Sequence, residues 1–250
     1  MRETVLEVCV DSVESAIAAE KGGATRLELC ANLIIGGTTP SVVLFDAVRA
    51  AVDIPVNVLI RPRFGDFLYT EPEYDIMRRE IEMFAERGAN AVVVGALNED
   101  GTLDREKMRG MIAASSGIHV TMHRAFDVCR DAFATLEEAL ELGVDTILTS
   151  GQKANAWEGR NLIGALMERA GDRADILVGA GVSAKMIADF RREFPGARAF
   201  HLSGKSILDS AMTYRNAEVS MGFPGISEFQ VWRTEEEAIR RAKEALAQDV

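Results

Sequence analysis

Residues 5–11 read VLEVCVD, and residues 26–32 read RLELCAN. Both stretches alternate apolar and polar residues, which is the period-two pattern of a β-strand with two different faces. The polar face combines carboxylates with thiols in each case: Glu7, Cys9 and Asp11 in the first stretch, and Glu28, Cys30 and Asn32 in the second. An amphipathic segment ending in two glycines separates them, which predicts a strand, a helix and a second strand.

The same unit of strand, turn and helix recurs along most of the chain. Further apolar stretches begin near residues 55, 91, 119, 146, 175 and 199. Eight strands alternating with helices over about 200 residues predict a single-domain α/β fold, a (β/α)8 barrel of the TIM type. A doubly wound open sheet is the alternative, but the GxGxxG motif of a dinucleotide-binding fold is absent after the first strand.

The C-terminal part departs from this pattern. Residues 205–233 show little periodicity, and a helical pattern resumes over residues 234–247. We therefore expect a long irregular loop that crosses the barrel mouth or an interface, followed by a closing helix. No linker divides residues 1–250, so the sequence predicts one domain.

Composition excludes several classes of partner. The chain of 250 residues has 28 basic and 39 acidic side chains, a formal net charge of −11. Such a surface repels nucleic acid and anionic membranes. No apolar run approaches the ~18 residues of a transmembrane helix, and the N-terminus has no signal-peptide pattern. Three cysteines form no even disulfide framework, which predicts a cytoplasmic protein with reduced thiols.

The polar faces predict a pocket inside the barrel. Alternate residues of each strand point inward in a closed barrel. Further inward positions are predicted in the third, fifth and eighth strands: Arg61 and Arg63, then His123, then His201 and Ser203. Chemistry in such barrels takes place at the carboxyl ends of the strands. Glu7 and Glu28 lie nearer the strand beginnings, where an internal ion-pair network is the alternative to a catalytic role.

Several motifs together resemble the CutC family, which is named for copper homeostasis. They are EVCVDSVESA, RLELCANL, GGTTPS, IPVNVLIRPRFGDFLYT, TMHRAFD, ILTSGQKANAWEG and FHLSGKS, in order between about residues 6 and 206. The resemblance implies a TIM-type barrel, a cytoplasmic homodimer and a role in copper handling. It also implies that Cys9 and Cys30 are Cu(I) ligands.

The first functional hypothesis is therefore a copper-binding protein. Cu(I) prefers soft thiolate ligands, and adjacent parallel strands lie ~4.8 Å apart, close enough for two thiols to share one ion. Under this hypothesis Glu7, Glu28 and His201 support the site. The alternative is that Cys9 and Cys30 are small buried residues that fill space. Cys129 has no assigned role.

The second hypothesis is an enzyme acting on a small anionic or phosphorylated metabolite. His123 would be the acid–base group, with its imidazole oriented by Asp127. The residues expected to bind the anion are two arginines, one amide and the loops after the seventh and eighth strands: Arg61, Arg63, Asn32, Gly179, Gly181, Ser203 and Gly204. The alternatives are a histidine satisfied within its loop and glycines required only by turn geometry.

Overall fold

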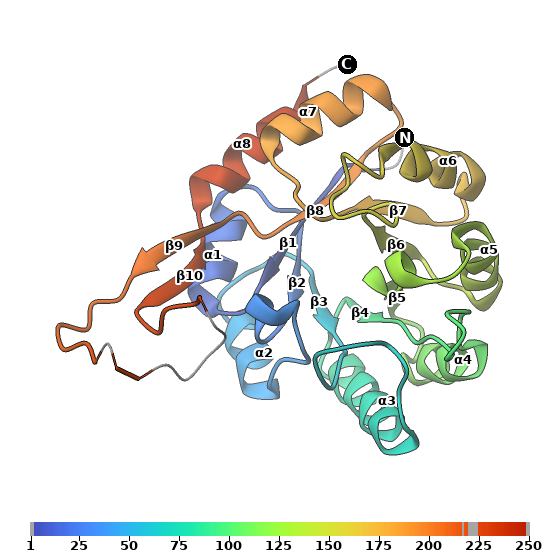
Figure 1. Ribbon diagram of the computed structural model, residues 1–250, viewed down its shortest axis with the longest axis horizontal. Coiled ribbons are helices and arrows are strands. Elements are labelled where there is room, and N and C mark those ends of the chain that lie inside the picture. The colour runs from blue at the N-terminus through green and yellow to red at the C-terminus, as the bar shows by residue number, and fades with distance from the viewer. Residues whose placement is uncertain (1–2, 217, 220–224, 249–250) are drawn as a thin grey trace.

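A closed parallel barrel forms the centre of the molecule (Figure 1). The computed structural model describes residues 3–216, 218–219 and 225–248. The barrel strands are β1 Val5–Val10, β2 Arg26–Leu29, β3 Val56–Leu59, β4 Ala91–Val94, β5 His119–Met122, β6 Thr146–Thr149, β7 Asp175–Val178 and β8 Ala199–Leu202. Each strand pairs with the next in sequence, and β8 pairs with β1. The predicted TIM-type barrel is confirmed.

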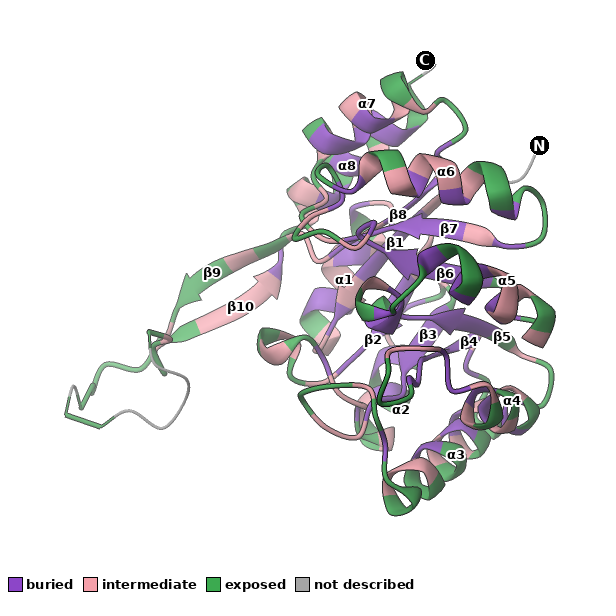
Figure 2. Cartoon of the chain, turned by 45° about the vertical axis from the view of Figure 1, so that its right-hand side comes forward, coloured by how far each residue is buried: buried purple, intermediate pink, exposed green. Residues whose placement is uncertain are grey.

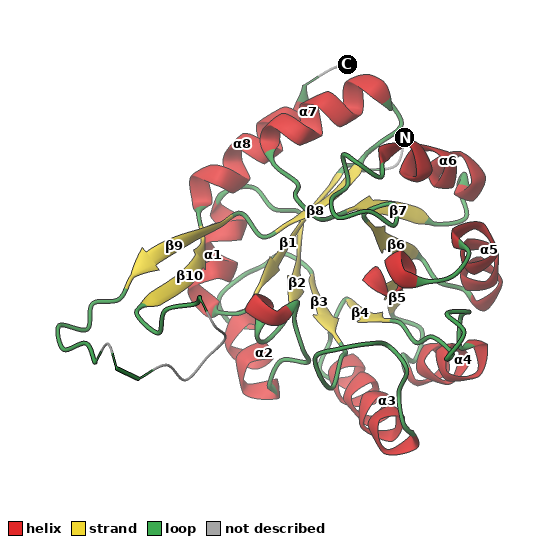
Figure 3. Ribbon diagram, in the orientation of Figure 1, coloured by secondary structure: helices red, strands yellow, loops and turns green. Residues whose placement is uncertain are grey.

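Helices surround the strands on the outside (Figure 3). They are α1 Val13–Lys21, α2 Val42–Arg49, α3 Glu71–Glu86, α4 Arg105–Ala114, α5 Ala132–Leu142, α6 Arg160–Ala170, α7 Ala184–Glu193 and α8 Glu236–Ala247. Side-chain caps fix where several begin. Ser12 accepts a hydrogen bond from the Ser15 amide at the start of α1, for example. Of the helices described, none combines the length and apolar character needed to cross a bilayer.

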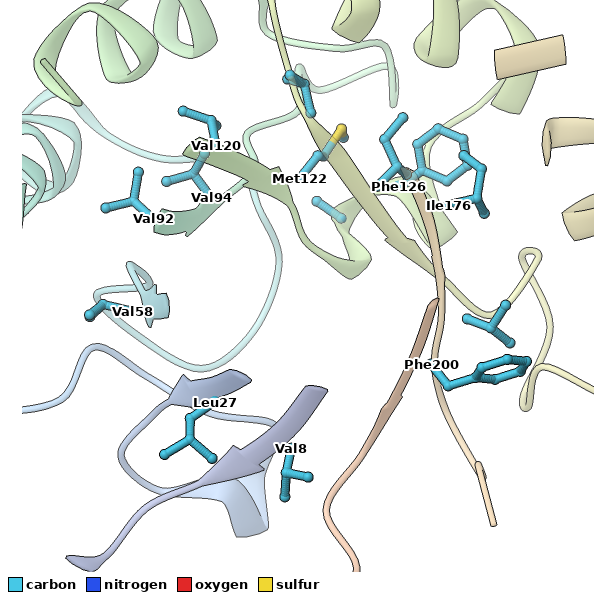
Figure 4. Close-up of a cluster of buried hydrophobic side chains, with 14 of the residues drawn as sticks. Val8, Leu27, Val58, Val92, Val94, Val120, Met122, Phe126, Ile176 and Phe200 are labelled. Carbon is cyan, nitrogen blue, oxygen red and sulfur yellow. The ribbon is translucent and has the colours of Figure 1, made fainter. Parts of the chain in front are cut away.

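The outward faces of the strands pack beneath these helices. Val8, Leu27, Val58 and Val92 come from four neighbouring strands and are completely buried (Figure 4). They belong to the main hydrophobic cluster, which also includes the apolar faces of the helices. Burial of this outer layer supplies most of the apolar driving force. Because the outward side chains of these strands pack against the helices, polar side chains can occupy the inward positions of β1 and β2.

The segment after β8 differs from the sequence prediction. Within residues 205–233, expected to be an irregular loop, β9 Lys205–Asp209 and β10 Gln230–Thr234 form an antiparallel ribbon. The ribbon extends away from the barrel (Figures 1 and 2). Cross-strand pairing, including the Lys205 ammonium 3.6 Å from the centre of the Trp232 ring, is not visible in sequence periodicity. The last helix begins at Glu236, two residues later than predicted.

Candidate functional site

A cavity of about 1160 Å³ opens at the carboxyl ends of the barrel strands. Its walls come from residues at or just beyond those ends and from the β9–β10 ribbon. Many residues predicted as a site line it: Cys9, Glu28, Asn32, Arg61, His123, Asp127, Gly181, His201 and Ser203. The structure therefore brings most of the predicted residues together in one place.

Glu7 lies within the barrel wall and anchors an ion-pair network. Its carboxylate accepts hydrogen bonds from Arg26 Nε at 2.5 Å and Asn57 Nδ2 at 2.9 Å, and lies 2.8 Å from His201 Nδ1. Burial raises the pKa of Glu7, but the Arg26 and His201 charges outweigh it and lower that pKa to about 2. Glu7 is therefore ionised and serves as the internal counter-ion rather than as an acid or base.

Three possible metal ligands converge beside this network. Strand register places Cys9 opposite Glu28, and Glu7 opposite His201. A Cys9 Sγ, a Glu28 carboxylate oxygen and a His201 ring nitrogen all lie within 4.8 Å of one another. His201 Nδ1 is engaged by Glu7, while Nε2 lies 3.7 Å from Glu28 Oε2. A carboxylate on one ring nitrogen, leaving the other for an ion, is how proteins orient a metal-binding histidine.

The surroundings of His201 favour the protonated form of its imidazole. Burial lowers the pKa of His201, but the Cys9 and Glu28 charges and the bond to Glu7 raise it well above its ordinary value. An ion bound at Nε2 would displace that proton, because only neutral imidazole ligates metals. The sequence assigned His201 a supporting role, whereas the structure places it beside Cys9 as a direct candidate.

Cys30 is completely buried next to this group. Its thiol donates a hydrogen bond to Glu28 Oε2 at 3.5 Å, and it packs in one small apolar cluster with Cys9 and Leu59. Burial, and then the nearby Glu28 charge, raise the pKa of the Cys30 thiol well above its ordinary value. Burial also raises the pKa of Glu28. The two predicted cysteines thus share a cluster, although Cys30 does not belong to the tight group of three.

A glycine after β2 packs closely against Leu59, beside the buried thiol. Gly37 has a φ of +87°, and a Cβ there would lie 2.7 Å from Leu59 Cδ2 and 3.5 Å from Cys30 Sγ. A side chain at that position would therefore be strained and would collide with the wall of the cluster. Cys129 is elsewhere: its sulfur accepts a hydrogen bond from Gln152 Nε2 at 3.4 Å, and it does not line the cavity.

Arg61 is a buried cation held by backbone carbonyls. Its Nη1 donates to Gly36 O and Gly37 O at 3.4 and 3.2 Å, and Nη2 donates to Gly65 O at 2.7 Å. No carboxylate among the described residues forms an ion pair with it. Nε is buried without a hydrogen-bond partner. The side chain lines the cavity and is only 8% exposed as a residue.

Arg63 was predicted to bind an anion together with Arg61, but it does not line the cavity. Its guanidinium pairs with Glu73 Oε1 at 2.5 Å and Asp66 Oδ1 at 3.0 Å, and lies over the Tyr69 ring. The strand pattern breaks because β3 ends at Leu59, four residues before Arg63. Arg63 instead stabilises the loop that leads into α3.

The predicted acid–base pair of His123 and Asp127 does not form either. β5 ends at Met122, and Asp127 lies in the short 3-10 helix Arg124–Val128. The Asp127 carboxylate accepts from Thr149 Oγ1 at 2.6 Å and from the Ser150 amide at 2.9 Å, so it holds the loop after β6. His123 Nδ1 accepts from the Ala125 amide at 3.1 Å.

His123 is a neutral hydrogen-bond donor facing the cavity. Burial, together with the charge of Arg61, lowers the pKa of His123 to about 3. Because Nδ1 is an acceptor, the proton of the neutral ring sits on Nε2, which is buried without a partner. Gly95 is required beside it, since a Cβ there would lie 2.7 Å from two atoms of the imidazole. No sequence pattern singles out Gly95, because its role depends on contact with His123 after the neighbouring strand β5.

This buried imidazole predicts a pH effect on stability. The unfolded chain takes up the proton below about pH 6.5, whereas folded His123 resists it down to about pH 3. The stabilisation is therefore complete above pH 6.5 and is lost as the pH falls toward 3. Between pH 7 and 5, we expect wild type to lose about 2 kcal/mol more unfolding free energy than His123→Gln. Urea unfolding at both pH values checks this, and equal losses would contradict it.

The glycine loops provide less of an anion site than the sequence predicted. Gly181 and Ser203 line the cavity, whereas Gly179 and Gly204 do not. A Cβ on Gly204 would meet Ile239, and one on Gly179 would meet Leu148, so both glycines permit close packing. Ser203 and Gly204 lead into β9 rather than into a helix, so no helix N-terminus stands behind them. Asn32 lies at the rim, where its Nδ2 donates to Thr38 Oγ1.

Comparison with known proteins identifies the family of this chain. Residues 4–206 match the sequence model of the CutC family. The chain is 46% identical to a CutC family protein of Parabacteroides distasonis over 94% of this chain and 98% of the relative. It is 44% identical to the mouse copper homeostasis protein cutC homolog over 98% of this chain and 90% of the relative.

A solved structure is similar to this chain in its fold. The crystal structure of the putative copper homeostasis protein CutC from Streptococcus agalactiae superposes with a TM-score of 0.75 at 31% identity, covering 80% of this chain and 98% of that one. An aldolase with 13% identity and a TM-score of 0.60 shares the barrel fold alone. The chain therefore belongs to the CutC family.

Proposed function

We propose that this protein serves copper homeostasis by binding one Cu(I) ion at the floor of the cavity. The ligands are the sulfurs of Cys9 and Cys30 and Nε2 of His201. The observation that carries the proposal is the convergence of Cys9 and His201 with the second ring nitrogen of His201 already held by Glu7. That arrangement orients His201 before any ion arrives.

The donor types suit Cu(I) better than a hard cation. Thiolate sulfur is a soft ligand and imidazole is intermediate, whereas Mg²⁺ and Ca²⁺ require several oxygen ligands. Glu28 supplies the single carboxylate in the group of three, and a carboxylate oxygen is a hard donor that suits Cu(I) poorly. The Cys30 thiol donates a hydrogen bond to Glu28, so Glu28 is placed to take up the proton that Cys30 releases when its sulfur binds the ion. We therefore assign Glu28 to proton uptake beside the site rather than to the ion.

Two further observations support this role. Curated relatives in mouse and human carry the name copper homeostasis protein cutC homolog, at 44% and 46% identity. Cys9, Cys30 and Cys129 are all free thiols. Free thiols beside a soft-metal site suit a reducing compartment, so we place the function in the cytoplasm.

An anaerobic titration tests the proposal. Cu(I) is added to the reduced protein in competition with a colorimetric Cu(I) chelator, and Cys129→Ser is measured in parallel. We expect one tightly bound ion per chain in both proteins, because Cys129 belongs neither to the group of three possible ligands nor to the small cluster of Cys9 and Cys30. Failure of the wild type to withdraw Cu(I) from the chelator would reject the proposal.

We also propose that two copies associate through the β9–β10 ribbon. Ile207 and Leu208 are 55% and 49% exposed on a ribbon that extends from the barrel (Figure 2). Successive side chains of a strand point to opposite faces, so each face of the ribbon carries one large exposed apolar side chain that association would cover. Analytical ultracentrifugation should give twice the chain mass of 27.2 kDa, and Ile207→Glu with Leu208→Lys should give a monomer. A monomeric wild type at micromolar concentration would exclude the dimer.

A further inference from the structure

The wall of the cavity that contains Arg61 and His123 has no role in the copper site. It nevertheless carries two buried hydrogen-bond donors that no protein atom satisfies: Arg61 Nε and His123 Nε2. Both residues line the cavity and are more than nine-tenths buried, at 8% and 5% exposure. Leaving such donors unpaired costs free energy, so a partner from solution is expected to satisfy them.

One aromatic ring, that of Phe67, lies close to both Arg61 and His123. The Arg61 guanidinium lies 5.0 Å from the centre of the Phe67 ring, and the centre of that ring lies 4.9 Å from the centre of the His123 imidazole. The charge of Arg61 also acts on His123 directly, since it contributes to lowering the pKa of that ring. Arg61, Phe67 and His123 therefore lie side by side in one wall of the cavity.

The charge at this wall favours an anion. Three carbonyl oxygens hold the Arg61 guanidinium, but they bring no negative charge to balance it. Although the chain has a net charge of −11, four basic side chains line this cavity, namely Arg61, Arg124, Lys205 and Arg233, against three acidic ones. A buried cation without a counter-ion binds an oxyanion well, because the hydrogen bonds are charge-assisted.

We infer that the cavity has a second binding site, in which Arg61 Nε and His123 Nε2 donate hydrogen bonds to the oxyanion of a small molecule. The oxyanion is a carboxylate or a phosphate, and the rest of the ligand occupies the cavity of about 1160 Å³. His123 acts as a neutral donor here, not as a base. The site is independent of Cu(I), because none of its donors belongs to the proposed copper ligands.

Thermal unfolding with two simple probes tests this inference. Inorganic phosphate and succinate, each at 50 mM and matched in ionic strength with sodium chloride, are compared in wild type, Arg61→Lys, His123→Phe and Arg63→Gln. We expect at least one probe to raise the Tm of wild type and of Arg63→Gln in a saturable manner. Arg61→Lys and His123→Phe should weaken that probe about tenfold or more. Which probe acts distinguishes a phosphate from a carboxylate ligand.

An NMR measurement on the wild type tests the same site even if the Arg61 variant unfolds. In ¹⁵N-labelled wild type, the arginine Nε–H signal of Arg61 should shift as the active probe saturates, while that of Arg63 stays in place. His123→Phe serves to confirm that the shift depends on the second donor. No stabilisation by either probe, or equal stabilisation in wild type and His123→Phe, would overturn the oxyanion site. Neither outcome bears on copper binding.

Discussion

Replacing Glu7 by Gln is expected to destabilise the fold by about 3 kcal/mol or more. The carboxylate is the buried counter-ion of both Arg26 and His201, and Asn57 donates to it as well. The amide keeps the size of the side chain but removes the charge, so two cations lose their partner inside the barrel. Breaking one side of a buried ion pair costs more than the pair contributes, because the remaining charge stays desolvated.

Glu137→Gln is the matched control for this change. Glu137 also pairs with two arginines, Arg169 and Arg173, but it does so on the exposed surface between helices. Solvent screens that network, so its loss should be far smaller than that of Glu7→Gln. Urea unfolding of the three proteins at pH 7 measures both values. Equal, small losses would contradict the view that Glu7 is the internal counter-ion.

Replacing Cys9 by Ser is expected to weaken Cu(I) binding by at least about 100-fold. Mutation of a residue that only hydrogen-bonds to a metal ligand typically costs about 10–100-fold in metal affinity. Loss of a soft ligand itself should cost more. Cys9 is the thiol that lies within 4.8 Å of both Glu28 and His201. Anaerobic chelator competition provides the affinity.

Comparison with the other two cysteines makes this result specific. Cys30→Ser should also lower the affinity, because the two sulfurs share one apolar cluster. Cys129→Ser should leave it unchanged, since that thiol contacts Gln152 outside the cavity. Three serine variants with equal affinities would exclude a site built on barrel cysteines.

The fold could be predicted from the sequence because barrel formation depends on local patterns. The first two strands show their two faces by alternation, and Glu7, Cys9 and Glu28 point inward as the period-two pattern requires. The same pattern identified His201 and Arg61 as inward residues. Those predictions needed only the direction of each side chain and the closure of the barrel.

The differences between prediction and structure concern residues beyond the end of a strand that is shorter than its sequence pattern indicates. β3 ends at Leu59 and β5 at Met122, so Arg63 and Asp127 lie in loops whose hydrogen bonds decide their direction. Such bonds join residues far apart in sequence, as Asp127 and Thr149 show. The ribbon of β9 and β10 was missed for a related reason: its pairing connects two short stretches more than twenty residues apart.

X-ray absorption at the copper edge of the Cu(I)-loaded protein tests the central claim most directly. We predict sulfur scatterers in the first shell together with the outer-shell pattern of one imidazole. The imidazole pattern should vanish in His201→Gln, and the sulfur contribution should fall in Cys9→Ser. A first shell of oxygen or nitrogen alone, or a sulfur shell that survives Cys9→Ser unchanged, would contradict a copper site at Cys9 and His201.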